Sequence, residues 1–164
     1  MSELDFVIRP FTLDDMDAVV ELSLLAWEPV FVSFRRHLGD NIFSILYPDW
    51  RKSQAEVVTE YCMDKDNHTT LVADVAGQVA GFLLYKLDEK SKTGEIYLLA
   101  VHPDHQSKNI GTHLNKTAIE AFREAGMTMA FVSTGGDEGH APARRSYEKA
   151  GFTPLPQVLY FKDL

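Results

Sequence analysis

The chain has 164 residues, of which 45% are hydrophobic, and its formal net charge is −8. This length suits one domain with its own hydrophobic core, so we expect residues 1–164 to form a single domain. The acidic balance argues against a general nucleic-acid binder, which needs a basic face, and no apolar run approaches the roughly 20 residues that cross a membrane.

The distribution of charge indicates which partners the protein could bind, and its cysteine content indicates its cellular compartment. Residues 1–82 carry 14 acidic and 6 basic side chains, whereas residues 83–164 carry 10 of each. The acidic half either keeps the surface soluble or attracts a cationic partner such as an amine, and both interpretations stay open. Cys62 is the only cysteine, and the N-terminus lacks the apolar core of a signal peptide, so we expect a cytoplasmic protein.

The first half of the chain predicts one strand followed by helices. Residues 6–10 are rich in β-formers and end at a proline. Thr12 is a typical N-cap because acidic residues follow it in the first turn, and apolar residues then recur at helical spacing. Residues 28–50 are aromatic and irregular, which indicates a second helix and a loop, and residues 53–64 predict a further helix.

The second half predicts a sheet with helices between later strands. Residues 70–75 and 79–87 are β-rich runs around the hairpin signal Ala76-Gly77-Gln78, and residues 95–101 are apolar on both faces, as in a central strand. The remaining predicted elements are a helix at 111–125, a strand at 129–133, a helix at 142–150 and a closing strand at 158–162. This order predicts an α/β (α+β) fold with a mixed, mostly antiparallel central sheet flanked by helices.

The turn between the strand at 95–101 and the following helix is the first candidate site. The first N–H groups of a helix lack internal partners and carry partial positive charge, so such a turn can bind an anion. Lys108 and the Thr112 hydroxyl could help these N–H groups to hold a pyrophosphate. A turn with one glycine is nevertheless more often plain connectivity, and neither a Walker loop nor a Rossmann fingerprint is present.

Two motifs give this turn a more specific meaning. The segment LLAVHPDHQSKNIGTHL, residues 98–114, resembles the acetyl-CoA-binding motif of the GNAT N-acetyltransferase superfamily, in which Q/R-x-x-G-x-G/A follows an apolar strand. The segment HAPARRSYEKAGF, residues 140–152, is similar to the second motif of that superfamily, N-x-x-A-x-x-x-Y-E-K-x-G-F. With the elements around them the motifs extend the resemblance over essentially the whole chain, although residues 28–68 carry no family signal.

The resemblance implies that acetyl-CoA is the acyl donor and that an amine attacks it directly in a ternary complex. The strand backbone before the turn would polarise the thioester carbonyl and pair with the pantetheine arm. Tyr147 would protonate the leaving thiolate, although a packed aromatic on an amphipathic helix is the alternative. The implied cofactor-binding residues are Leu99, Ala100, Val101, Gln106, Ser107, Lys108, Asn109, Ile110, Gly111, Thr112, His140 and Tyr147.

The base that deprotonates the incoming ammonium stays open at this point. Glu95 has the spacing of the catalytic glutamate in histone-type members of the superfamily, although it could simply be a solvated strand end. His102 and His105 are rivals because imidazole titrates in the useful range, and water is a further alternative. Two histidines on a turn without further ligands make a poor metal site, so no metal is expected.

Two positions depart from the family pattern. Asn109 replaces the first motif glycine, and we expect the turn to survive because asparagine tolerates the left-handed conformation. His140 replaces a frequent asparagine that contacts the cofactor, and an imidazole can still donate a hydrogen bond. Residues 135–139 predict a flexible loop near the cofactor arm, a candidate lid.

The expected function is transfer of an acetyl group to a primary amine. The acidic first half favours a cationic acceptor such as a polyamine, an aminoglycoside, an amino acid or a peptide amine. Aromatic residues that either line an acceptor cleft or belong to the core are Trp27, Phe31, Phe34, Tyr47 and Trp50. The alternatives are a non-catalytic module that binds CoA or a partner protein, and a generic phosphate-ligand binder. A homodimer is common for the fold, but no sequence feature fixes it.

Overall fold

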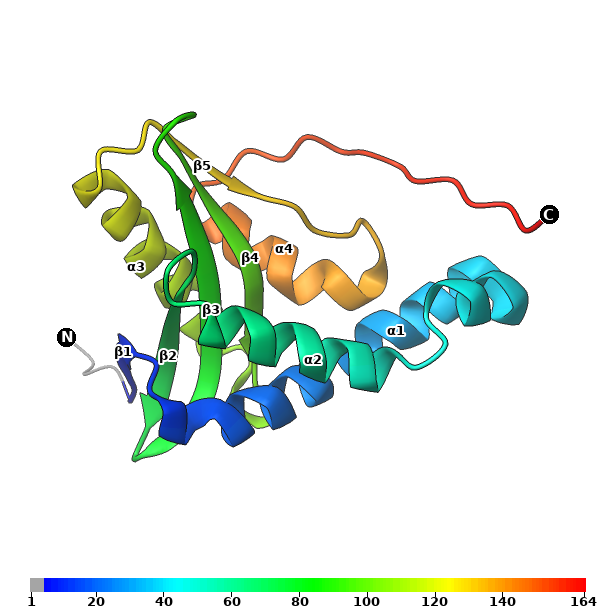
Figure 1. Ribbon diagram of the computed structural model, residues 1–164, viewed down its shortest axis with the longest axis horizontal. Helices are drawn as coiled ribbons and strands as arrows, with labels where there is room; N and C mark the ends of the chain where they lie inside the picture. Colours follow the sequence, from blue (N-terminus) through cyan, green and yellow to red (C-terminus); the bar gives the residue numbers. More distant parts are fainter. Residues whose placement is uncertain (1–4) are drawn as a thin grey trace.

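A five-stranded sheet is the centre of the computed structural model, which describes residues 5–164 (Figure 1). The strands are β1 (Val7–Pro10), β2 (Thr69–Val75), β3 (Gln78–Asp88), β4 (Thr93–Val101) and β5 (Met129–Val132). The helices are α1 (Met16–Leu46), α2 (Trp50–Met63), α3 (Ile110–Glu124) and α4 (Ala141–Lys149), with the 3-10 turns η1 (Leu13–Asp15), η2 (Pro103–His105) and η3 (Glu138–His140). Residues 1–4, which contribute to the signal-peptide expectation, lie outside the described residues.

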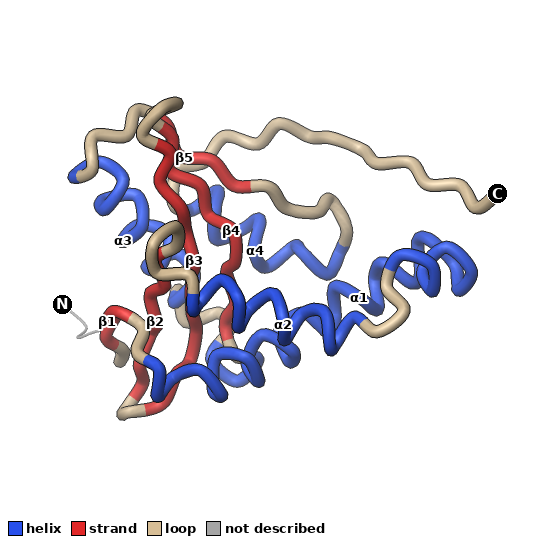
Figure 2. The backbone as a smooth tube through the Cα atoms, in the orientation of Figure 1, coloured by secondary structure: helices blue, strands red, loops and turns tan. Residues whose placement is uncertain are grey.

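The strands lie in chain order across the sheet, and their directions are mixed. Strands β1 to β4 are antiparallel to their neighbours, whereas β4 and β5 are parallel. The predicted hairpin joins β2 to β3 through Ala76 and Gly77, which both have positive φ, as tight hairpin turns require. This sheet with helices on both sides confirms the predicted fold class (Figure 2).

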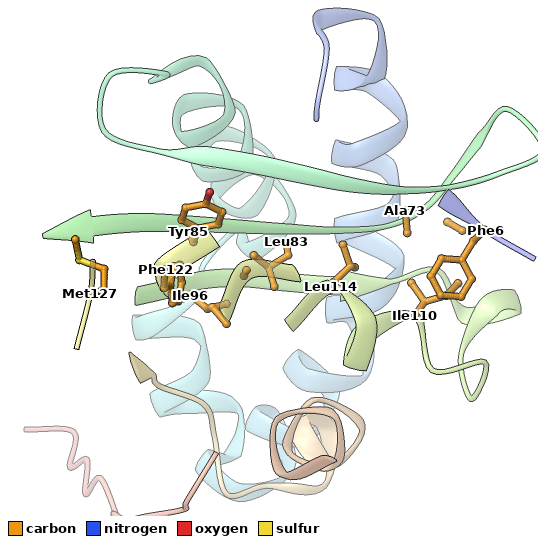
Figure 3. Packing of buried hydrophobic residues seen from close by; sticks show 11 residues of the cluster. Phe6, Ala73, Leu83, Tyr85, Ile96, Ile110, Leu114, Phe122 and Met127 are labelled. Atoms are coloured by element: carbon orange, nitrogen blue, oxygen red, sulfur yellow. The ribbon is translucent and has the colours of Figure 1, made fainter. Parts of the chain in front are cut away.

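The core lies on both faces of the sheet because successive side chains of a strand point to opposite faces. On one face, Phe82 and Leu84 of β3 pack in the cluster that α1 and α2 cover. On the other face, Leu83 of β3 packs with Leu114 and Phe122 of α3 (Figure 3). Both faces of β3 are therefore buried, which fixes α1 and α2 on one side and α3 on the other.

Helix α1 is longer than the sequence analysis predicts. Residues 28–50 were predicted to contain a second helix and a loop, whereas the first helix continues through Pro29 as far as a kink at Gly39 (φ 75°, ψ 164°), beyond which a further helical stretch runs to Leu46. Val30, which follows the proline, is buried, and this packing offsets the hydrogen bond that proline cannot donate. Helix α2 also begins three residues early, because the Asp49 side chain accepts the N–H of Lys52 and caps it.

The predicted closing strand at residues 158–162 is wrong. These residues form no strand, and residues 153–164 are all exposed. A strand requires a neighbouring backbone for its hydrogen bonds, and the segment instead runs extended and apart from the sheet (Figure 1). Asn41 Nδ2 donates to Asp163 Oδ2 at 2.8 Å, which ties the segment to α1.

Candidate active site

Strand β5 pairs over its whole length with only the first part of β4. Their parallel pairing extends from Thr93 opposite Met129 to Ile96 opposite Val132. Strand β4 continues to Val101, whereas β5 ends. Beyond Ile96, β3 is therefore the one described strand that pairs with β4.

A β-bulge marks the point where the two strands separate. Leu98 pairs with Leu84 and Ile96 pairs with Tyr85, so Tyr97 has no opposite residue on β3. After the bulge, the backbone groups of β4 that face away from β3 lack a strand partner in the described chain. These groups can pair with an extended ligand as a neighbouring strand would.

A cavity of about 450 Å³ lies beside this free edge of β4. The strand contributes Leu99, Ala100 and Val101, and α1 contributes Trp27 and Val30. The turn, the start of α3 and the loop before α4 contribute His105, Gln106, Ser107, Asn109, Ile110, Gly111, Thr112, Glu138, Gly139 and His140. Ten of the twelve predicted cofactor-binding residues thus line one cavity, and Lys108 and Tyr147 do not.

The turn before α3 has the geometry of an anion site. Ser107 and Asn109 both have φ of 63°, and Asn109 is the left-handed N-cap of α3. The expectation that asparagine supports this turn is therefore confirmed. The first intrahelical bond runs from His113 N–H to the Asn109 carbonyl, so the preceding N–H groups at the helix start remain available to a ligand.

Helix α4 adds two basic residues that the sequence analysis missed. Arg145 and Lys149 both line the cavity, and Lys149 Nζ lies 3.4 Å from Asn109 Oδ1. They are one helical turn apart, so they occupy one face of α4. This i, i+4 spacing within the second motif is the signal that could have found them. The pair adds positive charge beside the α3 N-terminus.

Tyr147 lies inside the protein instead of on the cavity wall. Its side chain is buried, and its ring centre is 5.9 Å from that of Phe152. Burial raises the pKa of the phenol well above its ordinary value, so the hydroxyl keeps its proton at neutral pH. Its role as an acid stays a prediction.

Glu95 lies on β4 before the bulge and does not line the cavity. Its neighbours across the sheet are Lys86 and Phe131. Burial, together with the nearby Glu95 carboxylate, raises the pKa of Tyr97, so these two side chains share one face of β4. The role of Glu95 as a base also stays a prediction.

The two histidines of the turn differ in position. His102 Nδ1 accepts the N–H of Asp104 at 3.2 Å, and the residue does not line the cavity. His105 does line it, and its Nδ1 is buried without a hydrogen-bond partner among residues 5–164.

The loop at residues 135–139, which was expected to be a flexible lid, is held by hydrogen bonds from α4 and from α1. Arg144 Nη1 donates to the carbonyls of Gly135 and Asp137, both at 2.6 Å. On the α1 side, Ser33 Oγ donates to Glu138 Oε2 at 2.9 Å. Hydrogen bonds to α4 and α1 therefore fix the position of the loop.

The aromatic residues of the first half divide into two groups. Phe31 stacks on Trp50 with ring centres 4.3 Å apart, and Phe34 stacks on Tyr47 at 5.6 Å. The Phe31–Trp50 pair therefore joins α1 to the start of α2, and the Phe34–Tyr47 pair packs the end of α1 against its own helix. Of the five predicted residues, Trp27 is the one that lines the cavity.

A second hollow of about 370 Å³ adjoins the cavity between α1 and η3. Its charged lining residues are Glu28, Arg36 and Glu138. Hydrogen bonds from the backbone, His37 and Ser33 lower the pKa of Glu138 to about 2, so this carboxylate is ionised at neutral pH.

No helix within residues 5–164 has the length and apolarity that a membrane crossing requires. The same residues contain no cluster of histidine, cysteine and carboxylate side chains that could hold a metal ion.

Comparisons with known proteins agree with the architecture. The sequence model of the acetyltransferase (GNAT) family matches residues 36–152. An uncharacterized N-acetyltransferase of Archaeoglobus fulgidus is 27% identical over 145 residues, which cover 85% of this chain and 88% of that protein. The mycothiol acetyltransferase of Sanguibacter keddieii is 33% identical over 93 residues, or 54% of this chain, and the match spans only 29% of that relative's length.

A solved structure shows the same fold at low sequence identity. The PaiA N-acetyltransferase of Thermoplasma acidophilum, in complex with coenzyme A, superposes with a TM-score of 0.70 at 17% identity, covering 96% of this chain and 94% of that one.

Proposed function

Because the chain belongs to the GNAT family of acetyltransferases, we propose that it transfers an acetyl group from acetyl-CoA to a primary amine by direct attack in a ternary complex. The observation that carries this proposal is the half-free edge of β4, which leads into the cavity at the N-terminus of α3. An extended arm can pair with the strand while a phosphate group meets the helix start.

The proposed cofactor site uses backbone groups more than side chains. The N–H groups of residues 106–112 would hold the pyrophosphate, supported by the partial positive charge of the helix start. Arg145 and Lys149 on the same cavity would add charge attraction. The free backbone at Leu99–Val101 would pair with the pantetheine arm, and one of its N–H groups would polarise the thioester carbonyl.

The proposed proton transfers involve a base and an acid. The acceptor is cationic at neutral pH, so a base must first remove a proton to give the attacking lone pair. Tyr147 would protonate the leaving thiolate, because its phenol keeps its proton at neutral pH. Glu95 is the base that the family resemblance suggests.

The proposed acceptor is a small-molecule or peptide amine with positive charge. Residues 1–82 carry the whole acidic excess of the chain. Within them, Glu28 lines the hollow beside the cavity, and Glu138 of η3 lines the same hollow. Two carboxylates next to the reaction site would favour an ammonium over a neutral acceptor. We expect the protein to act in the cytoplasm, and not on nucleic acids or membranes.

A homodimer is proposed on the basis of exposed apolar side chains after α4. Leu155, Val158 and Leu159 are 82%, 73% and 80% exposed. A group of exposed apolar side chains is typical of an interaction surface. Sedimentation equilibrium of the full chain gives the oligomeric state directly.

The function is tested by measuring thiol release from acetyl-CoA with a panel of polyamines, aminoglycosides, amino acids and peptides. We expect amine-dependent thiol release and an acetylated product that mass spectrometry identifies. Binding of CoA without thiol release for any amine would instead support the non-catalytic module. Equal binding of CoA and simple nucleotides would support a generic phosphate-ligand binder.

A further inference from the structure

The loop between β5 and α4 holds an aspartate–histidine pair beside the cavity. A carboxylate oxygen of Asp137 lies 2.5 Å from Nδ1 of His140. Their side chains are only 9% and 17% exposed. Because an ionised carboxylate can only accept, Nδ1 of the neutral ring carries the proton, and Nε2 has a free lone pair.

The second ring nitrogen of His140 is available to a substrate. Nε2 has no hydrogen-bond partner among residues 5–164, and it is not one of their fully buried unpartnered atoms. His140 lines the cavity together with Leu99–Val101 of β4. The imidazole and the strand edge where the thioester is proposed to lie therefore line the same cavity.

Two glycines of the loop make this arrangement sterically possible. A Cβ on Gly135 would lie 2.4 Å from both Asp137 Oδ1 and His140 Nδ1. A Cβ on Gly139 would lie 2.6 Å from Val30 Cα on α1. These separations are too short for any side chain, so the loop can hold the pair against α1 only with glycine at both positions.

Hydrogen bonds orient the aspartate as well as the loop. Gly139 N–H donates to Asp137 Oδ2 at 3.0 Å, so one carboxylate oxygen binds the backbone and the other binds the ring of His140. Burial opposes the negative charge of Asp137, but the hydrogen bond from His140 lowers the pKa of the carboxyl below its ordinary value.

The charged and titratable groups around the pair come from the loop, α1, α4 and η2, and β4 adds none. They are Asp137 and Glu138 on the loop, Glu28, Arg36 and His37 on α1, Arg144, Arg145 and Lys149 on α4, and His105 on η2.

We propose that His140 is the general base of the transfer reaction and that Asp137 is the positioning residue that orients it. This inference rests on the proposed acetyltransferase function and replaces Glu95 as the base. Imidazole suits the task because its pKa lies near neutral pH, and Asp137 fixes the tautomer with Nε2 unprotonated.

The proposed step balances in protons and bonds. Nε2 of His140 takes one proton from the ammonium, and the nitrogen lone pair then forms the N–C bond with the thioester carbon. The C–S bond breaks, the sulfur keeps its electron pair, and Tyr147 donates a proton to it. The second proton of the attached nitrogen restores the phenol, and His140 releases its proton to water.

The pH profile of kcat/KM with the best amine tests this assignment. In the native protein we expect kcat/KM to fall on the acid side, because a protonated His140 cannot accept the proton of the ammonium. His140→Asn restores the usual residue of the family motif and keeps a hydrogen-bonding side chain, so acetyl-CoA binding should change little. We expect kcat to fall about 100-fold and the acid limb to disappear.

A variant of Asp137 distinguishes a role in orienting His140 from a role in stabilising the loop alone. In Asp137→Asn the amide no longer fixes the ring tautomer with Nε2 unprotonated, so kcat should fall about tenfold while the KM for acetyl-CoA changes little. Gly135→Ala should also lower kcat, because the new Cβ displaces the pair, whereas Gly136→Ala is the matched control because no described atom lies within 4 Å of its Cβ. An unchanged kcat and pH profile in His140→Asn, or loss of the acid limb in Glu95→Gln instead, would overturn the proposal.

A spectroscopic measurement keeps the inference testable if no amine is acetylated. Nitrogen-15 spectra of the His140 ring, identified by its loss in His140→Asn, should show a protonated Nδ1 and a shift of Nε2 when CoA is added. A protonated Nε2 or no response to CoA would refute the arrangement. Absence of thiol release with every amine would refute the proposed function itself.

Discussion

Tyr147 combines a motif position with a buried environment. Burial raises the pKa of its phenol, so the proton is present throughout the neutral range, and removing the hydroxyl leaves the aromatic packing against Phe152 intact. We predict that Tyr147→Phe lowers kcat about 100-fold while the Kd for acetyl-CoA changes less than twofold, because a general acid acts only during the reaction. Steady-state kinetics and calorimetry measure the two quantities.

Tyr160 provides a matched control for this variant. It is 91% exposed in the segment after α4, so Tyr160→Phe should leave both quantities unchanged. If Tyr147→Phe retains the native kcat, Tyr147 is not the acid.

Asp15 and Arg9 belong to an ion-pair network near the N-terminus, far from the two motifs in the sequence. The two nitrogens Nη1 and Nη2 of Arg9 donate to the two oxygens of Asp15, both at 2.8 Å, and Arg9 Nε donates to Asp74 at 3.0 Å. The Asp15 side chain is only 9% exposed. The hydrogen bonds from Arg9 lower the pKa of Asp15, although burial opposes this.

The pH dependence of this network follows from the sign of the shift. Since the folded pKa lies below the unfolded value of about 3.9, the stabilisation is complete above that value and is lost as the pH falls through the folded pKa. We predict that Asp15→Asn lowers the free energy of unfolding by about 2 kcal/mol at pH 7 and by less below pH ~4. Urea unfolding at both pH values measures this difference.

The exposed neighbour Asp14 is the control for the same experiment. Asp14→Asn should change the free energy of unfolding by less than about 0.5 kcal/mol. An equal loss at both pH values in Asp15→Asn would show that the charge of Asp15 has no role.

At the scale of elements, the contact between β4 and α3 decides where the cofactor turn lies. Gly94 of β4 lies so close to the Phe122 ring of α3 that a Cβ would be 2.4 Å from it. Phe122 is itself held by an edge-to-face contact with Tyr85 at 5.1 Å. The absence of a side chain at Gly94 therefore lets α3 pack directly on the strand that precedes its own N-terminal turn.

We predict that Gly94→Ala lowers the free energy of unfolding by about 1–3 kcal/mol, because the buried ring must move. Chemical denaturation of this variant and of Gly136→Ala, which has space for a Cβ, measures the effect. Similar stability of the two variants would mean that α3 adjusts without cost.

At the scale of the whole molecule, charge separates the acceptor side from the cofactor side. The acidic excess lies in residues 1–82, which include α1 and α2. The basic residues Arg145 and Lys149 lie on α4, beside the start of α3. An anionic donor and a cationic acceptor would thus approach surfaces of opposite charge.

This separation predicts a dependence on salt. The KM of a polyamine acceptor should rise several-fold between about 0.05 and 0.3 M NaCl, because salt screens its attraction to the acidic surface, while kcat stays constant. A monoamine of similar size should show a weaker effect. Equal salt dependence for both acceptors would contradict an electrostatic contribution from the acidic half.

The sequence determined the local elements and the chemistry of the cofactor turn. The hairpin at Ala76-Gly77, the left-handed Asn109 and the fold class were predicted correctly because they depend on local backbone preference and on side-chain period. Ten predicted cofactor residues share one cavity because a single turn and strand carry nine of them. The single domain and the roles of Tyr147 and Glu95 stay predictions.

Only the tertiary structure decided how distant segments meet. Residues 28–38 continue α1 through a proline because Val30 and Ser33 on one face of the helix are buried, and residues 158–162 form no strand because they do not meet the sheet. The bond from Ser33 to Glu138 joins residues 105 positions apart and helps to set the loop that carries the Asp137–His140 pair. Such contacts depend on packing between elements, and no local pattern of residues encodes that packing.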